Sequence, residues 1–329
     1  MLASGICVRT IPLERIEASA QAIYDLVVRT PVIRLPLPDA LADRLAGSEI
    51  FLKLETLQPV GSFKIRGARN AIRQLSRDEY REGIWTVSAG NAAQGVALAA
   101  RHVGAPCSVM VIDTAPQAKL DAIRRLGATI VPATYDECWE TVTAHASPRM
   151  RGRFVHPFDD DDFIAGNATL GLELLDQVPD LDVVVGAVGG GGLLSGVGSA
   201  IRARKPHVKI VAAEPVTAAP LHTSLEKGRA CVLDTWQASF VDGAGGKSVL
   251  PTMWPLLSTL VEESIVVSLT EVADAMKLVA DRCHVIAEGA AGCAVAAALS
   301  GRIHGRIVAI VSGGNIDLST FARVVGACE

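Results

Sequence analysis

Four short segments contain residues whose types and spacing could do chemistry, and the first of them surrounds a lysine. In residues 61–67 (GSFKIRG), Lys64 is flanked by small and apolar residues. A lysine amine in desolvated surroundings can be neutral enough to attack a carbonyl and form a Schiff base. A surface lysine near the start of a helix is the commoner case, so this segment alone does not decide between the two.

The second segment, residues 88–95 (SAGNAAQG), has the pattern of a junction between a strand and a helix. The free backbone N–H groups at the start of a helix favour an anion such as a carboxylate. An ordinary helix cap provided by Ser88 or Asn91 explains the same residues. Both interpretations stay open at this point.

The third segment is a run of four glycines, Gly189–Gly192, that follows a buried apolar stretch. Such a run is unfavourable in chain entropy, but it lets backbone amides approach a phosphate at the start of a helix. A merely structural turn rarely uses four glycines, so we favour a phosphate site. The run does not match the dinucleotide pattern GxGxxG, and residues 243–248 are not a P-loop because Val241 stands where its first glycine is required.

The fourth segment, residues 312–315 (SGGN), ends the last clear strand. The hydroxyl of Ser312 can serve as a neutral hydrogen-bond partner for a ring nitrogen. A lysine for an aldehyde, a glycine loop for a phosphate and a polar group for a ring nitrogen together describe one ligand. That ligand is pyridoxal 5′-phosphate, which the sequence therefore predicts as the cofactor.

The composition limits what kind of protein could carry these segments. Of 329 residues, 50% are hydrophobic and 4% aromatic, and the formal net charge is −4. Such a chain can bury a large core of small residues, and it lacks the basic excess of nucleic-acid binders. We see no secretory leader and no uninterrupted apolar run of some 18 residues, which argues against export and against a membrane span.

Cysteines and histidines give no sign of a metal site. The seven cysteines are scattered without a CxxC pair, and the seven histidines lack HExxH spacing. An odd and scattered set of cysteines is typical of free thiols in a reducing compartment. We therefore expect a cytoplasmic protein without a bound metal that acts on a small molecule rather than on nucleic acid or a membrane.

Apolar strands and helix-like segments alternate along the chain. Strands are predicted at 84–88, 107–112, 128–132, 153–156, 183–188, 209–213 and 306–311, and helices at 91–102, 114–126, 165–178, 193–204, 271–282 and 288–299. Strand–helix–strand repeats form right-handed parallel crossovers, so the predicted fold class is α/β, with mainly parallel sheets flanked by helices. Two such units imply two lobes, and loops at the carboxyl ends of the strands should line the cleft between them.

With these segments in place, the chain resembles the serine/threonine dehydratase family of fold-type II pyridoxal-phosphate enzymes, which also contains serine racemases. The resemblance runs from about Leu52 to Val325. Besides the four segments, it rests on Lys53-Leu54-Glu55, Thr114-Ala115-Pro116, Gly127-Ala128, Phe158-Asp159-Asp160, Ile164-Ala165-Gly166, Ala213-Glu214-Pro215, Val241-Asp242-Gly243 and Glu288-Gly289-Ala290. It implies a small domain at 81–157, a large cofactor-binding domain formed by 1–80 and 158–329, and a homodimer.

The resemblance also implies roles for individual residues. Lys64 would be the catalytic residue that carries the cofactor, Asn91 would contact the 3′-oxygen of its ring, and Ser312 would face the ring nitrogen. The implied cofactor-binding set is Phe63, Lys64, Asn91, Gly189, Gly190, Gly191, Gly192, Leu193, Gly243, Glu288 and Ser312, with Phe63 and Gly243 on the two ring faces. The implied set for the substrate carboxylate is Ser88, Ala89, Gly90 and Asn91.

The implied reaction is β-elimination from a β-hydroxy amino acid such as L-threonine or L-serine, which yields a 2-oxo acid and ammonia. Freed Lys64 would act as the base at Cα. Because Ser312 is neutral, it would not hold the ring nitrogen protonated, and rapid loss of the leaving group fits better than transamination. Glu288 would be either structural support near the cofactor or a proton-transfer group.

Three positions depart from the family pattern. Ala89 stands where racemases have a serine that acts as a second acid or base, so dehydration is favoured over racemisation. Ala92 replaces a frequent histidine and reshapes the substrate side. Ala219 and the proline after it lie where metal-activated relatives have an acidic residue, which makes a divalent-cation site doubtful and would leave Glu214 as a buried, hydrogen-bonded acid.

Several alternatives stay open. The substrate could be another β-hydroxy acid, such as hydroxyaspartate or a hydroxyectoine-derived compound. No motif in the sequence indicates what the substrate carries beyond its β-carbon. Serine racemase-like activity and β-replacement are other reactions of the same cofactor. A nicotinamide-dependent dehydrogenase would require the missing GxGxxG pattern. A binding protein without catalysis would not need Lys64.

Overall fold

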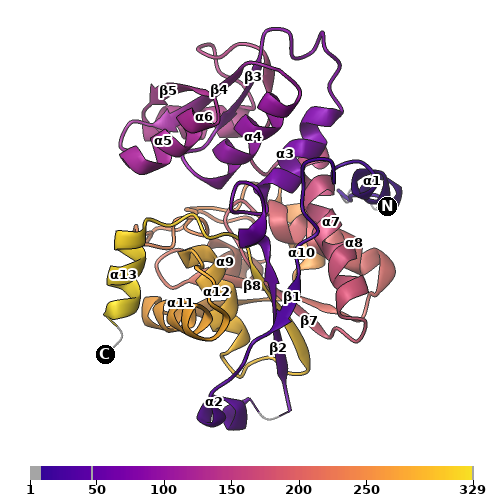
Figure 1. Cartoon of the computed structure of the whole chain (residues 1–329), viewed down its shortest axis with the longest axis vertical. Helices are drawn as coiled ribbons and strands as arrows, with labels where there is room; N and C mark the ends of the chain where they lie inside the picture. The colour runs from indigo at the N-terminus through magenta and orange to yellow at the C-terminus, as the bar shows by residue number, and fades with distance from the viewer. Residues whose placement is uncertain (1–8, 46, 328–329) are drawn as a thin grey trace, which may run out of the picture.

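The larger of two sheets has six strands and is parallel apart from one edge strand (Figure 1). The computed structural model describes residues 9–45 and 47–327. In the order of pairing, the sheet consists of β1 (Val32–Arg34), β2 (Glu49–Leu54), β10 (Arg306–Val311), β7 (Val183–Ala187), β8 (Lys209–Pro215) and β9 (Glu263–Val267). β1 runs antiparallel to β2, and the other neighbours are parallel. The last of these strands along the chain, β10, therefore lies inside the sheet.

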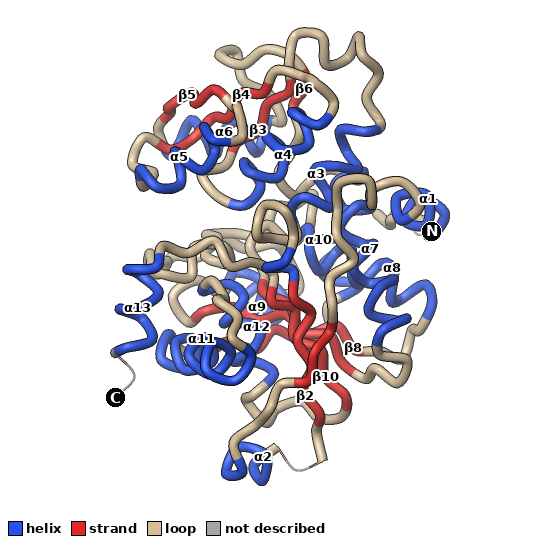
Figure 2. Tube along the Cα trace, viewed as in Figure 1, coloured by secondary structure: helices blue, strands red, loops and turns tan. Residues whose placement is uncertain are grey.

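The smaller sheet has four parallel strands and stands apart from the larger one (Figure 2). In the order of pairing, it consists of β5 (Thr129–Ala133), β4 (Cys107–Ile112), β3 (Ile84–Val87) and β6 (Arg153–Phe154). Together with α4 (Asn91–His102), α5 (Gln117–Arg125) and α6 (Tyr135–Ala144) it forms the smaller lobe, and the six-stranded sheet with its helices forms the larger lobe. The predicted α/β class with two mainly parallel sheets is confirmed, and the domain boundaries at 81–157 stay a prediction.

Helices cover both faces of the six-stranded sheet (Figure 1). One apolar core lies under α7 (Asp161–Gln177), α8 (Gly192–Arg204) and α10 (Trp254–Leu260), and a second lies under α11 (Leu269–Cys283) and α12 (Gly289–Ala298). The other described helices are α1 (Leu13–Ala20), α2 (Asp39–Arg44), η1 (Glu55–Leu57), α3 (Lys64–Arg73), α9 (Pro220–Lys227) and α13 (Leu318–Gly326). Every residue of α12 is buried, which explains its run of small residues.

Predicted and observed elements agree best where the pattern is long and regular. The elements predicted at 91–102, 107–112 and 306–311 match α4, β4 and β10 residue for residue. The helix predicted at 165–178 begins earlier, at Asp161, because the side chain of Asp160 caps it by accepting a hydrogen bond from the Phe163 N–H. The strand predicted at 153–156 already ends at Phe154. The sequence does not predict β1, β2, β9, α1, α2, α3, α6, α9, α10 or α13.

A cluster of four buried charged residues joins β2, η1, α3 and α7. Lys53 and Glu55, which belong to one sequence motif, lie beside Arg66 and Glu173. Arg66 Nε is 2.8 Å from Glu55 Oε2, and Arg66 Nη1 is 2.7 Å from Glu173 Oε1. Lys53 pairs with the second oxygen of Glu173. Because buried charges need close partners, the cluster holds α3 against α7 and so fixes the helix that begins at Lys64.

The described cysteines are free, as predicted. They are Cys107, Cys138, Cys231, Cys283 and Cys293. Cys7 and Cys328 lie outside the described residues. Within residues 9–45 and 47–327, no helix is both long enough and apolar enough to cross a bilayer.

Candidate active site

Lys64 is the first residue of α3 and is partly buried between the two lobes. Its Nζ donates a hydrogen bond of 2.7 Å to the backbone carbonyl of Pro157. Burial lowers the pKa of the Lys64 amine to about 8, although the charge of Glu288 opposes this effect. A larger fraction of this amine is therefore neutral near pH 7 than of an ordinary lysine. That property suits an amine that must attack a carbonyl.

Backbone hydrogen bonds hold the segment before Lys64 against the segment that ends β10. The Phe63 N–H donates to the Ser312 carbonyl at 3.0 Å, and the Gly314 N–H donates to the Gly61 carbonyl at 2.9 Å. The two predicted segments are far apart in the sequence, yet these two backbone hydrogen bonds place them side by side. Ser312 is buried, and among the described residues no hydrogen bond of its hydroxyl is found. A free hydroxyl of this kind is available to a ligand.

The four glycines form the turn between β7 and α8. Gly191 has a φ of +87°, a conformation that L side chains rarely adopt, and the helix begins at Gly192. Among the described residues, none accepts a hydrogen bond from the backbone N–H groups of residues 189–194. Unpaired N–H groups at a helix start, reinforced by the helix dipole, form a site for an anion such as a phosphate.

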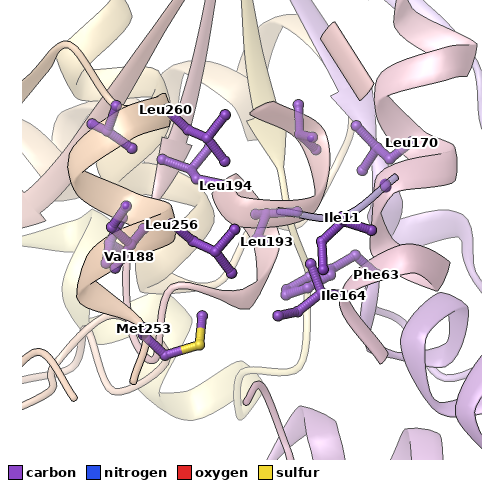
Figure 3. Packing of buried hydrophobic residues seen from close by; sticks show 14 of the residues in the cluster. Ile11, Phe63, Ile164, Leu170, Val188, Leu193, Leu194, Met253, Leu256 and Leu260 are labelled. Carbon is purple, nitrogen blue, oxygen red and sulfur yellow. The ribbon is translucent and has the colours of Figure 1, made fainter. Parts of the chain in front are cut away.

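Close packing around this turn explains why it consists of glycines. A Cβ at Gly190 would lie 2.2 Å from the ring of Phe158, and a Cβ at Gly189 would lie 2.6 Å from the carbonyl oxygen of Gly243. The predicted site residue Gly243 therefore does lie beside the predicted phosphate loop. Leu193, just after the turn, shares a buried apolar cluster with Phe63 (Figure 3).

Asn91, the first residue of α4, is tied to two residues of the larger lobe. Its Nδ2 donates to Glu288 Oε1 at 2.7 Å, and its Oδ1 accepts a hydrogen bond from Asn315 Nδ2 at 2.7 Å. The Glu288 N–H in turn donates to the Gly313 carbonyl at 3.0 Å. Burial, and after it the negative charge of Asp242, raises the pKa of Glu288 to about 7. This carboxyl group can therefore be neutral or charged near physiological pH.

The loop before Asn91 is partly open to solvent. Ser88, Ala89 and Gly90 are all partly exposed, and a Cβ at Gly90 would meet no atom within 4 Å. The Gly90 N–H donates to the Ser88 hydroxyl at 3.1 Å. The loop thus borders open space at the start of a helix, an arrangement that can bind a carboxylate.

A cavity of about 560 Å³ opens between the lobes. It is lined on the smaller-lobe side by Gln94, Lys119 and Arg125, and on the larger-lobe side by Asp242, Glu288 and Asn315. Lys119 and Asp242 form an ion pair that bridges the two lobes. Both lobes line this cavity, and of the predicted site residues Glu288 borders it, whereas Lys64, Ser312 and the glycine run do not.

Two residues to which the sequence analysis gave no role connect the predicted ones. Pro157 holds the Lys64 amine, and its neighbour Phe158 packs against the glycine turn. The motif that begins at Phe158 pointed to this region without indicating its role. Asn315 holds the Asn91 side chain and also donates to the Val60 carbonyl. The roles of all these residues toward cofactor and substrate stay predictions.

Two groups of residues bear on the prediction that no metal is bound. Ligand atoms of His145, His156 and Asp159 lie within 4.8 Å of one another, but both ring nitrogens of His156 already hold hydrogen bonds. Glu214 is buried, and its two oxygens accept hydrogen bonds from the Leu221 and His222 N–H groups and the Ser264 hydroxyl. We assign no metal to either group, and the prediction remains open.

Comparison with known proteins shows which family the chain is similar to. Residues 23–313 match the family model of pyridoxal-phosphate dependent enzymes. The chain is 38% identical to an L-threonine ammonia-lyase of Thermotoga maritima over 96% of its own length and 78% of the relative. The fold is similar to a processed threonine deaminase of Solanum lycopersicum (TM-score 0.85, 33% identity, 95% of this chain, 86% of the other). It is also similar to maize serine racemase (TM-score 0.87, 32% identity, 97% and 98%).

Proposed function

The chain belongs to the family of pyridoxal-phosphate dependent enzymes, and from this premise we propose how its site works as an ammonia-lyase. The reaction removes water across Cα and Cβ of a β-hydroxy amino acid, and hydrolysis then yields a 2-oxo acid and ammonia. L-threonine is the first candidate substrate, because the relative from Thermotoga maritima is named for it. L-serine is the second, since it shares the β-hydroxyl.

One arrangement supports this proposal above all others. The Lys64 amine, the glycine run and Ser312 come from three distant parts of the chain. A hydrogen bond from Phe63 joins the lysine segment to Ser312, and the turn at residues 157–158 contacts both the Lys64 amine and the glycine run. These groups fit an aldehyde, a phosphate and a ring nitrogen. When bound, pyridoxal 5′-phosphate supplies an aldehyde that condenses with amines and a ring that stabilises negative charge at Cα.

Different residues of the chain then have different roles in the reaction. The N–H groups of the glycine turn bind the phosphate, and the partly exposed loop at Ser88–Asn91 binds the substrate carboxylate. The lowered pKa of Lys64 lets its free amine take the proton from Cα at neutral pH. Ser312 offers the ring nitrogen a neutral hydrogen bond and does not hold a proton there. Phe63 and Gly243 cover the faces of the ring.

Glu288 supports the site rather than transferring a proton. Its carboxylate orients Asn91, whose side chain we place at the 3′-oxygen of the ring. Because its pKa is raised to about 7, Glu288 adds little fixed negative charge beside the reacting atoms below that pH.

The side chain of Ala89 favours elimination over racemisation. Racemisation needs a second acid or base on the face opposite Lys64, and a methyl group cannot move a proton. Ala89 is partly exposed in the loop that we assign to the substrate carboxylate. We expect any racemisation to be slow compared with ammonia release.

Assembly and location are part of the proposal as well. We propose a homodimer, as the family resemblance implies, and a cytoplasmic location, which the free thiols of the described cysteines support. Light scattering of the purified holoenzyme would test the first. A single-chain mass would contradict it.

The decisive experiment is a panel of β-hydroxy amino acids assayed for ammonia and 2-oxo acid. L-threonine, L-serine and 3-hydroxyaspartate form the panel, and chiral analysis of the remaining amino acid measures racemisation. Lys64→Ala should lower turnover by about 10²–10⁴-fold. The matched control is Lys227→Ala, because Lys227 is exposed at the end of α9. Turnover of none of the three acids would contradict the proposal.

Borohydride reduction of the holoenzyme identifies the lysine that carries the cofactor. Reduction fixes the cofactor to its amine, and peptide mass mapping then locates the adduct. The expected position is Lys64. An adduct on another lysine, or no adduct, would refute the assignment.

A further inference from the structure

His156 uses both of its ring nitrogens to hold a turn of the backbone. Its Nδ1 accepts hydrogen bonds from the N–H groups of Phe158 at 3.2 Å and Asp159 at 2.6 Å. Its Nε2 lies 3.1 Å from the Val142 carbonyl in the last turns of α6. A carbonyl can only accept, so the proton is assigned to Nε2 and the ring is the neutral tautomer.

The turn that His156 holds contacts the reactive region on two sides. The carbonyl of Pro157, the residue next to His156, accepts the hydrogen bond from Lys64 Nζ. The ring of Phe158 packs against Gly190, and a Cβ at Gly192 would lie 3.0 Å from the Phe158 carbonyl. A shift of this turn would therefore move the acceptor of the amine and the wall of the phosphate loop together.

We propose that His156 is a positioning residue for Lys64, which acts by fixing the turn that presents the Pro157 carbonyl to the lysine amine and Phe158 to the glycine turn. This inference rests on the proposed function, because it takes Lys64 as the reactive amine. Among the described residues, the hydrogen bonds of the His156 ring go to Val142, Phe158 and Asp159 and not to the amine or the glycines. Its effect passes through the two backbone N–H groups that it binds.

The surroundings keep the ring in the required state. His156 is almost fully buried and stacks on His145, with ring centroids 4.4 Å apart. Burial, followed by the neighbouring His145, lowers the pKa of His156 to about 3. Asp159, which faces the ring, is itself held by Arg9 and by Thr252. Nδ1 therefore stays unprotonated and available as an acceptor across the working range of the enzyme.

A pair of substitutions separates the positioning role from a purely structural one. His156→Asn keeps an acceptor for the N–H groups two and three residues ahead, as asparagine does in many turns, but loses the donor to Val142. His156→Gln places an amide nearer the old Nε2, so it can keep the donor to Val142 while losing the acceptor at Nδ1. If His156 positions the turn, the Asn variant should form the adduct faster than the Gln variant. If His156 only anchors α6, the Gln variant should be the faster of the two.

The main readout is the rate at which apoenzyme forms its covalent adduct with added pyridoxal 5′-phosphate, followed by visible absorbance. Leaving buried N–H groups without an acceptor weakens a site by about tenfold or more, so His156→Gln should be slower by at least that factor. His156→Asn should stay within about threefold of wild type. Thermal unfolding of each apoenzyme shows whether the variant is folded.

A histidine in another part of the fold provides the control for this experiment. His222→Asn removes a histidine that also contacts a backbone carbonyl, that of Ser264, but lies in α9 away from Lys64, so its rate should match wild type. Equal rates for Asn and Gln, or a faster Gln variant, would overturn the inference. If wild type itself forms no adduct at Lys64 after borohydride reduction, the proposed function fails instead.

Discussion

Glu288 Oε1 lies 2.7 Å from Asn91 Nδ2, so a single hydrogen bond joins the start of α12 in the larger lobe to the start of α4 in the smaller lobe. Its acceptor is a buried carboxyl group whose pKa is raised to about 7. The bond thus connects the two lobes through a group that titrates near neutral pH. This relationship has a measurable effect on stability.

We expect Glu288→Gln to stabilise the apoenzyme at high pH but not at low pH. Because the folded-state pKa is raised above the ordinary value of 4.5, the wild type loses stability as pH rises from there through about 7. The loss is at most about 3 kcal/mol, and glutamine avoids it while it can still accept from Asn91. Urea unfolding at about pH 5 and about pH 8 tests this. An equal difference between variant and wild type at both pH values would contradict it.

The lowered pKa of Lys64 predicts an unusual pH dependence for its labelling. In the apoenzyme, the amine should become reactive toward an aldehyde as pH rises through about 8, because only the neutral amine attacks. Exposed lysines should react at higher pH. Competitive labelling at a series of pH values, read out by peptide mass spectrometry, measures both classes together. A Lys64 midpoint close to that of Lys227 would show that burial does not tune the amine.

Gly191→Ala should weaken both the fold and cofactor binding. The φ of Gly191 is +87°, and a Cβ there would lie 2.7 Å from Leu257 Cδ1. Gly127 has nearly the same φ, +88°, but open space around it, so Gly127→Ala isolates the cost of the backbone alone. We expect Gly191→Ala to lose about 1–3 kcal/mol more stability than this control. Equilibrium unfolding and titration with pyridoxal 5′-phosphate give the two values, and equal losses would refute the explanation.

Ser312→Ala should affect the holoenzyme and spare the apoenzyme. Among the described residues no hydrogen bond of the hydroxyl is found, so its removal should change apoenzyme stability by no more than about 0.5 kcal/mol. With cofactor bound, loss of one hydrogen bond should weaken affinity by about two- to tenfold. Thermal unfolding with and without pyridoxal 5′-phosphate separates the two states. An effect confined to the apoenzyme would argue against a ligand partner for this hydroxyl.

Arg66→Ala should destabilise the protein strongly. Removing the guanidinium takes a cationic partner from two buried carboxylates, those of Glu55 and Glu173. The expected loss is about 3–5 kcal/mol. Arg124 pairs with Asp121 at the surface, and Arg124→Ala should change stability by less than about 1 kcal/mol. Urea unfolding compares the two, and similar losses would show that the buried cluster contributes little.

The long, regular elements could be predicted because the spacing of their apolar residues and the residues that end each element indicate the same bounds. α4, β4 and β10 carry clear patterns, and their predicted bounds are correct. Short or irregular elements carried too little signal. β1 has three residues, and α1 and α2 begin without a side-chain cap, so neither the pattern nor a capping residue marked them.

Individual residues of the candidate site could be predicted from the sequence, but the contacts between them could not. A lysine, a glycine run and a serine can be recognised in a sequence, and Phe63, Gly243 and Glu288 came from the family resemblance. Pro157 contributes only a backbone carbonyl, which every residue has, so its sequence identity does not reveal its contact with Lys64. The role of Asn315 likewise depends on its hydrogen bond to Asn91, which forms only in the folded chain.

The position of β10 has a consequence for how the protein is made. This strand is the last of the described strands to be synthesised, yet it inserts between β2 and β7 and brings Ser312 to the start of α3. While the ribosome is still adding the residues before it, the lysine has emerged but its pocket has not been closed. The proposed cofactor pocket around Lys64 is therefore closed only after β10 has been synthesised.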